Sequence, residues 1–374
     1  MIDSATFRTA VSQQLLARLG QVPSLTAFVG LDGFVDEILH VVDKRTDSTT
    51  YTRVPTIASY AERLAAAAGK STNIELVNVL TKLGGNGPIM ANALASFGMQ
   101  VTYLGSLGYP AIHPVFETFQ KRAKVHSICG PGLTDALEFD DGKLMVGKHY
   151  TLKEVTWENI LRRFGLGPFQ ENFGTANLVG FVNWTMLPFM SDIWETVQSD
   201  VCPRLKGPRR WLFVDLADPE KRLPQDIRRA LGLITKFQEH FDVILGLNEK
   251  EAHEVGHVLG FECSGDAPES LAELSMAIHR AVPVNTLVVH PVSYALAVSA
   301  GEVSVVKGLV CSKPKITTGA GDHFNSGFCL GKLLGFDNAA SVLCGVTASG
   351  HYVRTAQSSS VADLAKTMEQ WPQS

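Results

Sequence analysis

The sequence predicts an α/β protein with a doubly wound, mostly parallel sheet, helices on both faces of that sheet, and a small β-lid. Short apolar runs, typical of strands buried on both faces, alternate along the chain with amphipathic patterns of helical period. Hydrophobic residues make up 45% of the 374 residues and charged residues 19%, a balance that supports a large buried core. We therefore expect residues 1–374 to form a single α/β domain.

The alternation defines the elements of the predicted sheet. The apolar runs expected to form its strands are residues 25–31, 101–104, 178–182, 211–214, 243–245 and 287–289. The helical patterns between them cover residues 88–97, 187–201, 225–237 and 270–281. Because a helix separates most successive strands, we expect these strands to run parallel.

Two stretches interrupt the alternation. Residues 41–54 are polar and rich in threonine, and residues 134–146 have the pattern of a β-hairpin around an Asp-Asp-Gly turn. They predict a separate small β-layer that covers one end of the main sheet, inserted as segments of roughly 36–54 and 101–148. The alanine-rich residues 57–70 are predicted to form a helix after the first segment.

Composition excludes several classes of protein. The 33 basic and 37 acidic residues give a net charge of −4, which provides no general attraction to nucleic acid or to acidic lipid. No run of about 20 apolar residues predicts a membrane span. The N-terminus lacks the features of a signal peptide. The six cysteines are scattered without a Cys-x-x-Cys pair, which is typical of free thiols in a reducing compartment. We expect a cytoplasmic protein without nucleic-acid or membrane partners.

The clearest chemical signal is the run Thr-Thr-Gly-Ala-Gly-Asp-His-Phe-Asn-Ser-Gly at residues 317–327, which leads into a helical pattern. The turn Gly319-Ala320-Gly321 leaves backbone N–H groups uncovered, and at a helix N-terminus such groups bind anions. Asp322 then stands where a carboxylate can accept a proton from an attacking hydroxyl. The plain alternative is that Asp322 only caps the helix.

This run, together with motifs described below, resembles the C-terminal signature of the ribokinase-like (PfkB) carbohydrate kinases. The resemblance extends from Phe28 to about Ser358, with the motifs in the order found in that family. It implies a ribokinase-like fold, a sugar-like acceptor and ATP with Mg2+ as the donor. It also implies that Asp322 is the catalytic base and that Gly319, Ala320 and Gly321 form the anion hole.

Two further motifs resemble the acceptor site of the family. Gly84 and Gly85 precede a helix, where glycines let a ligand approach the backbone, and Asn86 follows them. The family carries an Asp after the first strand that holds two sugar hydroxyls, and a carboxylate can accept from both. Asp36 fits this role best by its position before a lid strand, with Asp32 as the reserve candidate. An ordinary strand-to-helix turn and a surface Asp are the alternatives.

A motif after the strand at residues 243–245 resembles the donor site. Asn248 and Glu251 match the Asn-x-x-Glu pattern that organises magnesium, water and phosphate in the family, and Thr318 is assigned to the same site. We expect Mg2+ to be held through water, without a direct protein ligand. Asn248 and Glu251 also fit a capping box at the start of a helix, and the two roles are compatible.

Several positions depart from the pattern of the family. Ile316 stands where relatives carry an Asp that helps to hold a monovalent cation, so we do not expect potassium activation. Ile89 stands where relatives usually carry an Asn in the glycine-turn element. Both glycines of the family's nucleotide strand are replaced, by Val292 and Ala295, so both ATP and ADP remain possible donors.

The sequence thus predicts a kinase that transfers a phosphoryl group from a nucleotide to a hydroxyl of a sugar or sugar-like molecule. A nucleoside kinase and a catalytically silent ligand-binding protein on the same fold remain alternatives. The altered nucleotide strand favours the silent protein, whereas the intact turn before Asp322 opposes it. A Rossmann dehydrogenase fits less well, because no Gly-x-Gly-x-x-Gly follows the first strand. A homodimer formed through the lid is a further possibility.

Overall fold

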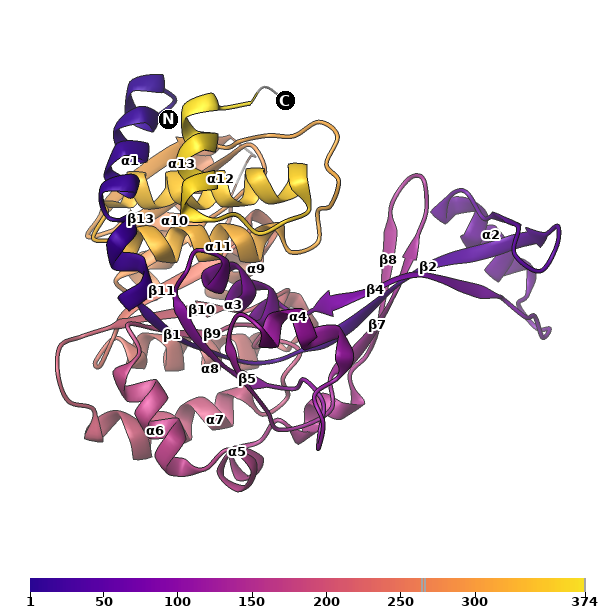
Figure 1. The fold of residues 1–374 in the computed structure, drawn as a ribbon, viewed down its shortest axis with the longest axis horizontal. Helices are drawn as coiled ribbons and strands as arrows, with labels where there is room; N and C mark the ends of the chain where they lie inside the picture. The colour runs from indigo at the N-terminus through magenta and orange to yellow at the C-terminus, as the bar shows by residue number, and fades with distance from the viewer. Residues whose placement is uncertain (264, 266, 373–374) are drawn as a thin grey trace.

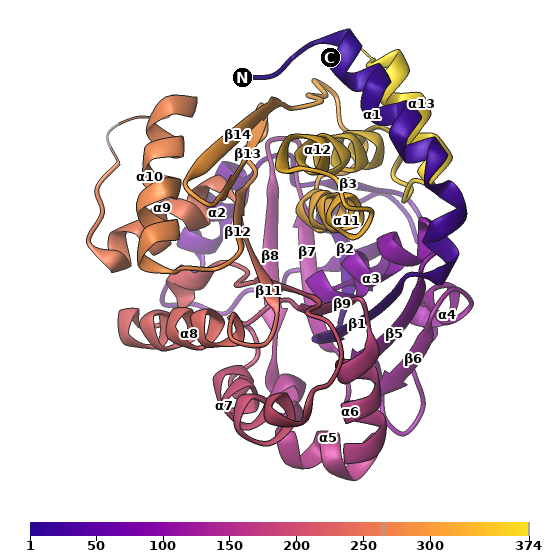
Figure 2. The ribbon, with the colours of Figure 1, turned by 90° about the vertical axis from the view of Figure 1, so that its left-hand side faces the viewer.

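The computed structural model describes residues 1–263, 265 and 267–372, and it contains two sheets. The main sheet has nine strands and lies between two layers of helices (Figures 1 and 2). The small sheet has five strands and projects from one side of the main body together with helix α2 (Figure 1). Among the described residues, no helix is both long and apolar enough to cross a bilayer.

The main sheet has the strand order β14-β13-β12-β11-β10-β9-β1-β5-β6. Its strands are β1 (Thr26–Leu31), β5 (Gln100–Gly105), β6 (Lys124–Ser127), β9 (Leu178–Phe181), β10 (Trp211–Asp215), β11 (Asp242–Leu247), β12 (Thr286–Val289), β13 (Tyr294–Ser299) and β14 (Glu302–Lys307). Neighbours from β6 to β12 pair in parallel, whereas β13 pairs antiparallel with β12 and with β14. All six predicted core strands lie in this sheet.

Helices cover both faces of the main sheet, which confirms the predicted doubly wound architecture (Figure 2). One face packs against α5 (Trp157–Arg163), α6 (Leu166–Thr175), α7 (Met190–Thr196), α8 (Pro224–Phe237), α9 (Glu249–Leu259) and α10 (Pro268–Ala281). The other packs against α1 (Ala5–Ala17), α3 (Asn86–Ser96), α4 (Glu117–Gln120), α11 (Ala320–Leu333), α12 (Asn338–Thr355) and α13 (Val361–Gln370). Each interface is a separate hydrophobic cluster, so both faces of the strands are removed from water.

The small sheet is built around one long strand. Its strands are β2 (Phe34–Arg45), β3 (Tyr51–Arg53), β4 (Leu76–Gly84), β7 (Gly132–Glu138) and β8 (Lys143–Lys148). β2 pairs with β4 antiparallel and with β7 in parallel, and β7 and β8 form the predicted hairpin. Helix α2 (Ile57–Ala66) is shorter than the predicted helix at 57–70. The hydrophobic cluster under this sheet contains five buried residues, Leu39, Val41, Val54, Leu137 and Phe139.

The lid segments predicted at 36–54 and 101–148 differ from the small sheet in two respects. The second segment begins too early, because β5 and β6 pair in the main sheet. The apolar run in β5 is buried like the other core strands. Within the predicted segment 101–148, only the strands of the hairpin β7–β8 belong to the small sheet. The predicted segments also omit β4, which pairs with β2 along most of its length. Most side chains of β4 are at least partly exposed, so the strand lacks a buried apolar pattern.

Candidate active site

A cavity of about 360 Å³, which we call the first cavity, lies between the small sheet and the carboxyl ends of the main-sheet strands. This is the edge at which α/β proteins bind ligands. The small sheet contributes Phe34 and Thr134 to its wall, and the loops after β9 and β10 contribute Asn183 and Asp218. Of the predicted site residues, those that line it are Asp36, Gly85, Asn86, Glu251, Thr318, Gly319 and Asp322.

A second cavity of about 400 Å³ lies on the other side of the turn that begins α11. Asn248, Ala320 and Gly321 are the predicted site residues in its wall. His290 also lines it, and its ring packs against Phe324 with 4.6 Å between ring centroids. The turn therefore separates the two cavities: Gly319 faces the first, whereas the next two residues face the second.

The conformation of this turn depends on glycine. Gly319 is the N-cap of α11 and has φ of 94°, in the left-handed region that favours glycine. A Cβ there would lie 3.2 Å from the side chain of Ile89. Because α11 begins at Ala320, Asp322 is the third residue of the helix, and the alternative that Asp322 is the N-cap is wrong. The first amides of a helix have no intrahelical partner. The Ala320 amide donates to the Thr317 carbonyl at 3.1 Å, so the next amides, of Gly321 and Asp322, are the ones that an anion could use.

Asp322 is 5% exposed, and its carboxylate accepts a hydrogen bond from Asn86 Nδ2 at 3.1 Å. Burial raises the pKa of Asp322 to about 8, aided by the charges of Asp32 and Glu251 and opposed by the Asn86 hydrogen bond. A carboxylate whose pKa lies near neutral pH is suited to accept a proton from a hydroxyl group. The predicted base therefore combines an accessible position in the first cavity with a high proton affinity.

Asp36 lies at the centre of the small sheet. It stands opposite Lys82 of β4 and Thr134 of β7 in the strand register. Burial raises the pKa of Asp36, while the charge of Lys82 and a hydrogen bond from Thr134 oppose that rise. A Cβ on Gly84 would lie 2.4 Å from the Asp36 carboxyl group, so Gly84 leaves the space that this carboxyl group occupies. Gly85, with φ of 93°, then turns the chain into α3.

Asp32, the reserve candidate, has no exposed surface and does not line the first cavity. Its carboxylate accepts hydrogen bonds from Asn183 Nδ2 at 2.8 Å, from the Gly87 amide at 2.9 Å and from the Tyr103 hydroxyl at 3.2 Å. Burial raises the pKa of Asp32 to about 6 against these hydrogen bonds. Asp32 thus joins the loop after β9, the start of α3 and strand β5 behind the cavity wall, and the prediction that it contacts the acceptor is not supported.

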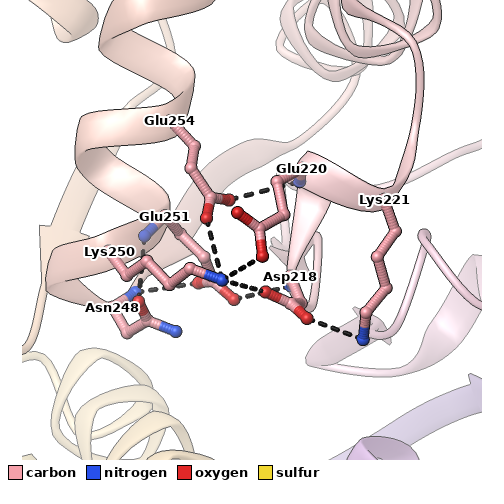
Figure 3. A network of polar contacts seen from close by, with 7 residues as sticks. All are labelled: Asp218, Glu220, Lys221, Asn248, Lys250, Glu251 and Glu254. Atoms are coloured by element: carbon pink, nitrogen blue, oxygen red, sulfur yellow. Dashed lines mark hydrogen bonds and ion pairs between the residues drawn. The ribbon is translucent and has the colours of Figure 1, made fainter.

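Asn248 and Glu251 form the capping box that the sequence allowed, at the start of α9 (Figure 3). Asn248 Oδ1 accepts from the Glu251 amide at 2.9 Å, and Glu251 Oε2 accepts from the Asn248 amide at 2.9 Å. The other oxygen of Glu251 accepts from the Asp218 amide at 2.8 Å. Burial and the charge of Asp215 raise the pKa of Glu251 to about 8. The pair borders both cavities, since Asn248 lines the second and Glu251 the first.

An exposed ion cluster flanks Glu251 (Figure 3). The carboxylates of Asp218, Glu220 and Glu254 lie close enough together to hold a metal ion. The Lys250 ammonium group lies among them, 2.8 Å from Asp218 and 3.2 Å from Glu254, and it also contacts Glu220. Lys221 pairs with the other oxygen of Asp218 at 2.6 Å. These lysines neutralise the carboxylates and hold the loop after β10 at the cavity wall.

One buried carboxylate of the site stands in the run Phe213-Val214-Asp215, which resembles an Asp-rich loop of the family but was given no role from the sequence. Asp215, at the end of β10, is buried and accepts from the Ala217 amide at 2.8 Å and from Asn325 Nδ2 at 2.9 Å. Burial and the charge of Asp322 raise the pKa of Asp215 to about 7. Asn183 and Lys82 were missed by the sequence analysis. A polar residue directly after a buried strand is the signal that identifies Asp215 and Asn183, but no such signal marks Lys82.

Thr318 was assigned to the donor side, but it lines the first cavity. Its neighbour Thr317 lines the second cavity instead. The Thr318 carbonyl accepts a hydrogen bond from the Tyr352 hydroxyl at 3.1 Å. Consecutive residues before the turn thus face different cavities, so spacing in the sequence does not reveal which cavity each residue faces.

Comparisons with known proteins identify the family of this chain. The family model for prokaryotic ketohexokinase matches residues 3–371. A ketohexokinase from Haloferax volcanii is 30% identical over 328 residues, which cover 87% of this chain and 86% of that protein. Similar solved structures include Escherichia coli phosphofructokinase-2 with substrates and products (TM-score 0.60, 13% identity, 92% and 98% coverage) and Thermotoga maritima ribokinase (TM-score 0.59, 16% identity, 92% and 98% coverage). The predicted ribokinase-like fold is confirmed, and the chain belongs to the prokaryotic ketohexokinase family of carbohydrate kinases.

Proposed function

We propose that this kinase phosphorylates a ketohexose with ATP as donor, and that Asp322 is the general base. The observation that supports this most directly is the turn at the start of α11. Its Gly319 and Asp322 border the first cavity, while Ala320 and Gly321 border the second. An acceptor in the first cavity and a nucleotide in the second meet at this turn. The activity of the ketohexokinase relative supports the choice of acceptor class.

In the proposed reaction, Asp36 and Asn86 orient the sugar so that one hydroxyl lies beside Asp322. Asp322 accepts the proton of that hydroxyl as its oxygen forms a bond to the terminal phosphorus of ATP. The bond from phosphorus to the bridging oxygen breaks, and ADP leaves with that electron pair. The amides at the start of α11 stabilise the charge on the transferred group. The products are ADP and a sugar phosphate.

The residues beside the turn fit a magnesium ion bound with the donor. Asp215 and Glu251 are buried carboxylates whose pKa values burial raises, which indicates that their negative charge is poorly compensated. We propose that Glu251 and Asn248 hold Mg2+ through water, as this ion commonly keeps several of its waters. When bound, Mg2+ neutralises charge on the donor phosphates. The residues of the chain supply orientation and the base.

We also propose that two copies associate through the small sheet. The small sheet and helix α2 expose apolar side chains, which are Leu64, Leu76, Val79, Leu80, Val146 and, at the rim of the first cavity, Met145. Exposed apolar patches of this kind are typical of interfaces. Light scattering on the intact protein is expected to give the mass of a dimer, and Leu80→Glu the mass of a monomer. A wild-type monomer at micromolar concentration would refute this association.

A reducing, cytoplasmic location accompanies this proposal. Cys129, Cys202, Cys329 and Cys344 are buried free thiols. Disulfides are rare in reducing compartments, so buried thiols of this kind are compatible with such a location. Fractionation of cells that express the protein is the direct measurement, and recovery in the oxidising extracellular fraction would contradict the proposal.

Phosphoryl transfer across an acceptor and donor panel tests the proposed function. Fructose and other ketohexoses, aldohexoses, ribose and adenosine are each supplied with ATP or with ADP, and sugar phosphate is measured directly. We expect the highest kcat/KM for a ketohexose with ATP. A preference for adenosine would favour the nucleoside kinase alternative, and a preference for ADP would refute the donor. No transfer to any acceptor, with ligand binding retained, would favour the silent binding protein.

A further inference from the structure

His323 follows the proposed base directly and has no part in the reaction described above. Its side chain is 2% exposed, and both ring nitrogens have partners. Nδ1 lies 2.7 Å from the Gly319 carbonyl oxygen, and Nε2 lies 2.9 Å from Ser358 Oγ. A carbonyl oxygen only accepts, so Nδ1 carries the hydrogen in this assignment, and Nε2 accepts from the Ser358 hydroxyl.

The contact continues to the acceptor side of the site. Ser358 Oγ accepts a hydrogen bond from Asn92 Nδ2 at 3.3 Å. Asn92 belongs to α3, the helix whose first residue, Asn86, donates to the Asp322 carboxylate. Each donor in this series points toward the next residue, from Asn92 through Ser358 and His323 to Gly319. The series therefore links α3 to the catalytic turn.

Tyr352 holds the neighbouring carbonyl from α12. Its ring stacks on the ring of His323, with 3.6 Å between centroids and 13° between planes. Its hydroxyl donates to the Thr318 carbonyl at 3.1 Å. Two stacked side chains thus hold two consecutive carbonyls, at Thr318 and Gly319. Since each peptide group is planar, a fixed carbonyl also fixes the direction of the N–H group in the same plane.

We propose that His323 and Tyr352 are positioning residues that hold the glycine turn in the geometry needed for phosphoryl transfer. The turn contains Gly319 and Gly321, which have more conformational freedom than other residues. Hydrogen-bond donors stabilise a transition state best when they are oriented beforehand. Within the turn, the Gly319 carbonyl accepts the His323 amide and the Thr317 carbonyl accepts the Ala320 amide, both at 3.1 Å, and the two rings add restraint from side chains.

The His323 ring acts through geometry and not through charge. Burial lowers the pKa of His323 to about 4, against the favourable effect of its hydrogen bond to Gly319. The ring is therefore neutral at neutral pH, which agrees with Nε2 acting as an acceptor. A neutral ring adds no positive charge to the proposed anion hole, so its effect on the rate comes through the position of the backbone.

The test separates the ring stack from the hydrogen bonds. His323→Phe keeps an aromatic ring but removes both nitrogens, and Tyr352→Phe removes only the hydroxyl. We expect His323→Phe to lower kcat about 10- to 100-fold, because small misplacements of catalytic groups have effects of that size. The KM for the ketohexose should change less than about threefold, since Asp36 and Asn86 are untouched. Tyr352→Phe should lower kcat about 3- to 10-fold, and the double variant by less than the product of the two.

Two further variants distinguish positioning from general stability. His323→Asn restores a donor near the Gly319 carbonyl, so it should recover most of the lost kcat. His351→Phe is the matched control: it lies on α12, and its ring forms a hydrogen bond with Thr367 at 3.4 Å. The control should keep wild-type kcat. Thermal unfolding of each variant shows whether the protein is folded at the assay temperature.

The positioning role of His323 and Tyr352 rests on the proposed catalytic role of the turn. The kinetics of the variants show which of these two roles fails. It is overturned if folded His323→Phe keeps kcat within about twofold, or if His323→Asn loses as much activity as His323→Phe. If His323→Phe does not fold, Tyr352→Phe decides, and kcat within twofold of wild type overturns the inference. Asp322→Asn is measured in parallel. If Asp322→Asn is inactive and His323→Phe is fully active, Asp322 is still supported as the base and only the positioning role is refuted.

Discussion

The two sheets differ in how they are buried. In the main sheet, two hydrophobic clusters cover both faces, and strands such as β9 and β12 are buried at every residue. In the small sheet, β4 and β8 are largely exposed, and a single cluster of five buried residues supports the sheet. Elements with few buried apolar contacts open at lower free energy than a protein core. The site therefore has one firmly packed wall and one wall of lower local stability.

The site residues on the two sheets have different proposed roles, in line with this difference in burial. Asp215, Glu251 and Asp322 belong to the main body, at the edge where the strands end. Asp36 and Thr134 belong to the small sheet. Groups that act on the transferred phosphoryl group need fixed positions, whereas acceptor contacts can form as the sugar binds. Variants on the main body are therefore expected to change kcat, and variants on the small sheet to change KM.

The largest effect is expected from Asp322→Asn. The amide keeps the size and most hydrogen bonds of the side chain but cannot act as the base, so kcat should fall about 10²- to 10⁴-fold. Because a buried carboxylate is removed, the thermal midpoint should not fall. Asp192→Asn, at an exposed position, is the control and should leave kcat unchanged. A fall in kcat of less than about threefold would refute the role of Asp322 as the base. It would also refute the assignment of kcat effects to the main body and KM effects to the small sheet.

A smaller effect, and one on a different constant, is expected from Asp36→Asn. Hydrogen bonds to charged groups contribute about 1.5–3 kcal/mol, so the KM for the ketohexose should rise about 10- to 100-fold. The kcat at saturating sugar should stay within about threefold. Asp135→Asn is the control on the same sheet, since Asp135 pairs with Lys148 at 2.7 Å and is absent from the wall of the first cavity. A fall in kcat with an unchanged KM would contradict the division.

The pH dependence of stability gives a third comparison. Burial raises the pKa values of Asp215, Glu251 and Asp322 to about 7, 8 and 8, so the folded protein binds more protons than the unfolded chain up to about pH 8. Stability without ligands should therefore fall as pH rises. Below about pH 6.5, the lowered pKa values of His290 and His323 have the opposite effect, because the unfolded chain binds their protons.

The thermal midpoint should therefore be measured between pH 6.5 and 8, where the carboxylates determine its pH dependence. We expect the thermal midpoint of the ligand-free protein to fall by about 2–4 °C over this range. Asp215→Asn should flatten the slope, whereas Asp135→Asn in the small sheet should not. A midpoint that rises between pH 6.5 and 8 would show that these carboxylates are ionised in the folded protein throughout.

The smallest effect concerns monovalent cations. Ile316 offers no side-chain oxygen beside the turn, and the carbonyls of Thr318 and Gly319 already accept from Tyr352 and His323. Replacement of sodium by potassium should therefore change kcat by less than about twofold. A several-fold increase would show that the main-body side of the site needs an ion as well as its own side chains. Ionic strength is held constant with choline as a third salt.

The main sheet was predictable from the sequence because its strands are apolar throughout. The small sheet was harder: β4 exposes Val79 and Leu80 to about half of their surface, so its apolar residues do not mark a buried face. The chemistry of the glycine turn was also predictable, since Gly319 and Asp322 lie close together in the chain. The environment of Asp32 was not, because its partners come from three separate elements.

The short connection from β4 to α3 joins the two sheets beside the base. β4 ends at Gly84, and two residues later Asn86 donates to the Asp322 carboxylate. Asp36, on β2, stands opposite Lys82 of β4, so a sugar held by Asp36 lies next to the strand that leads to the partner of the base. One unbroken stretch of backbone thus runs from the neighbour of the acceptor's anchor to the neighbour of the base.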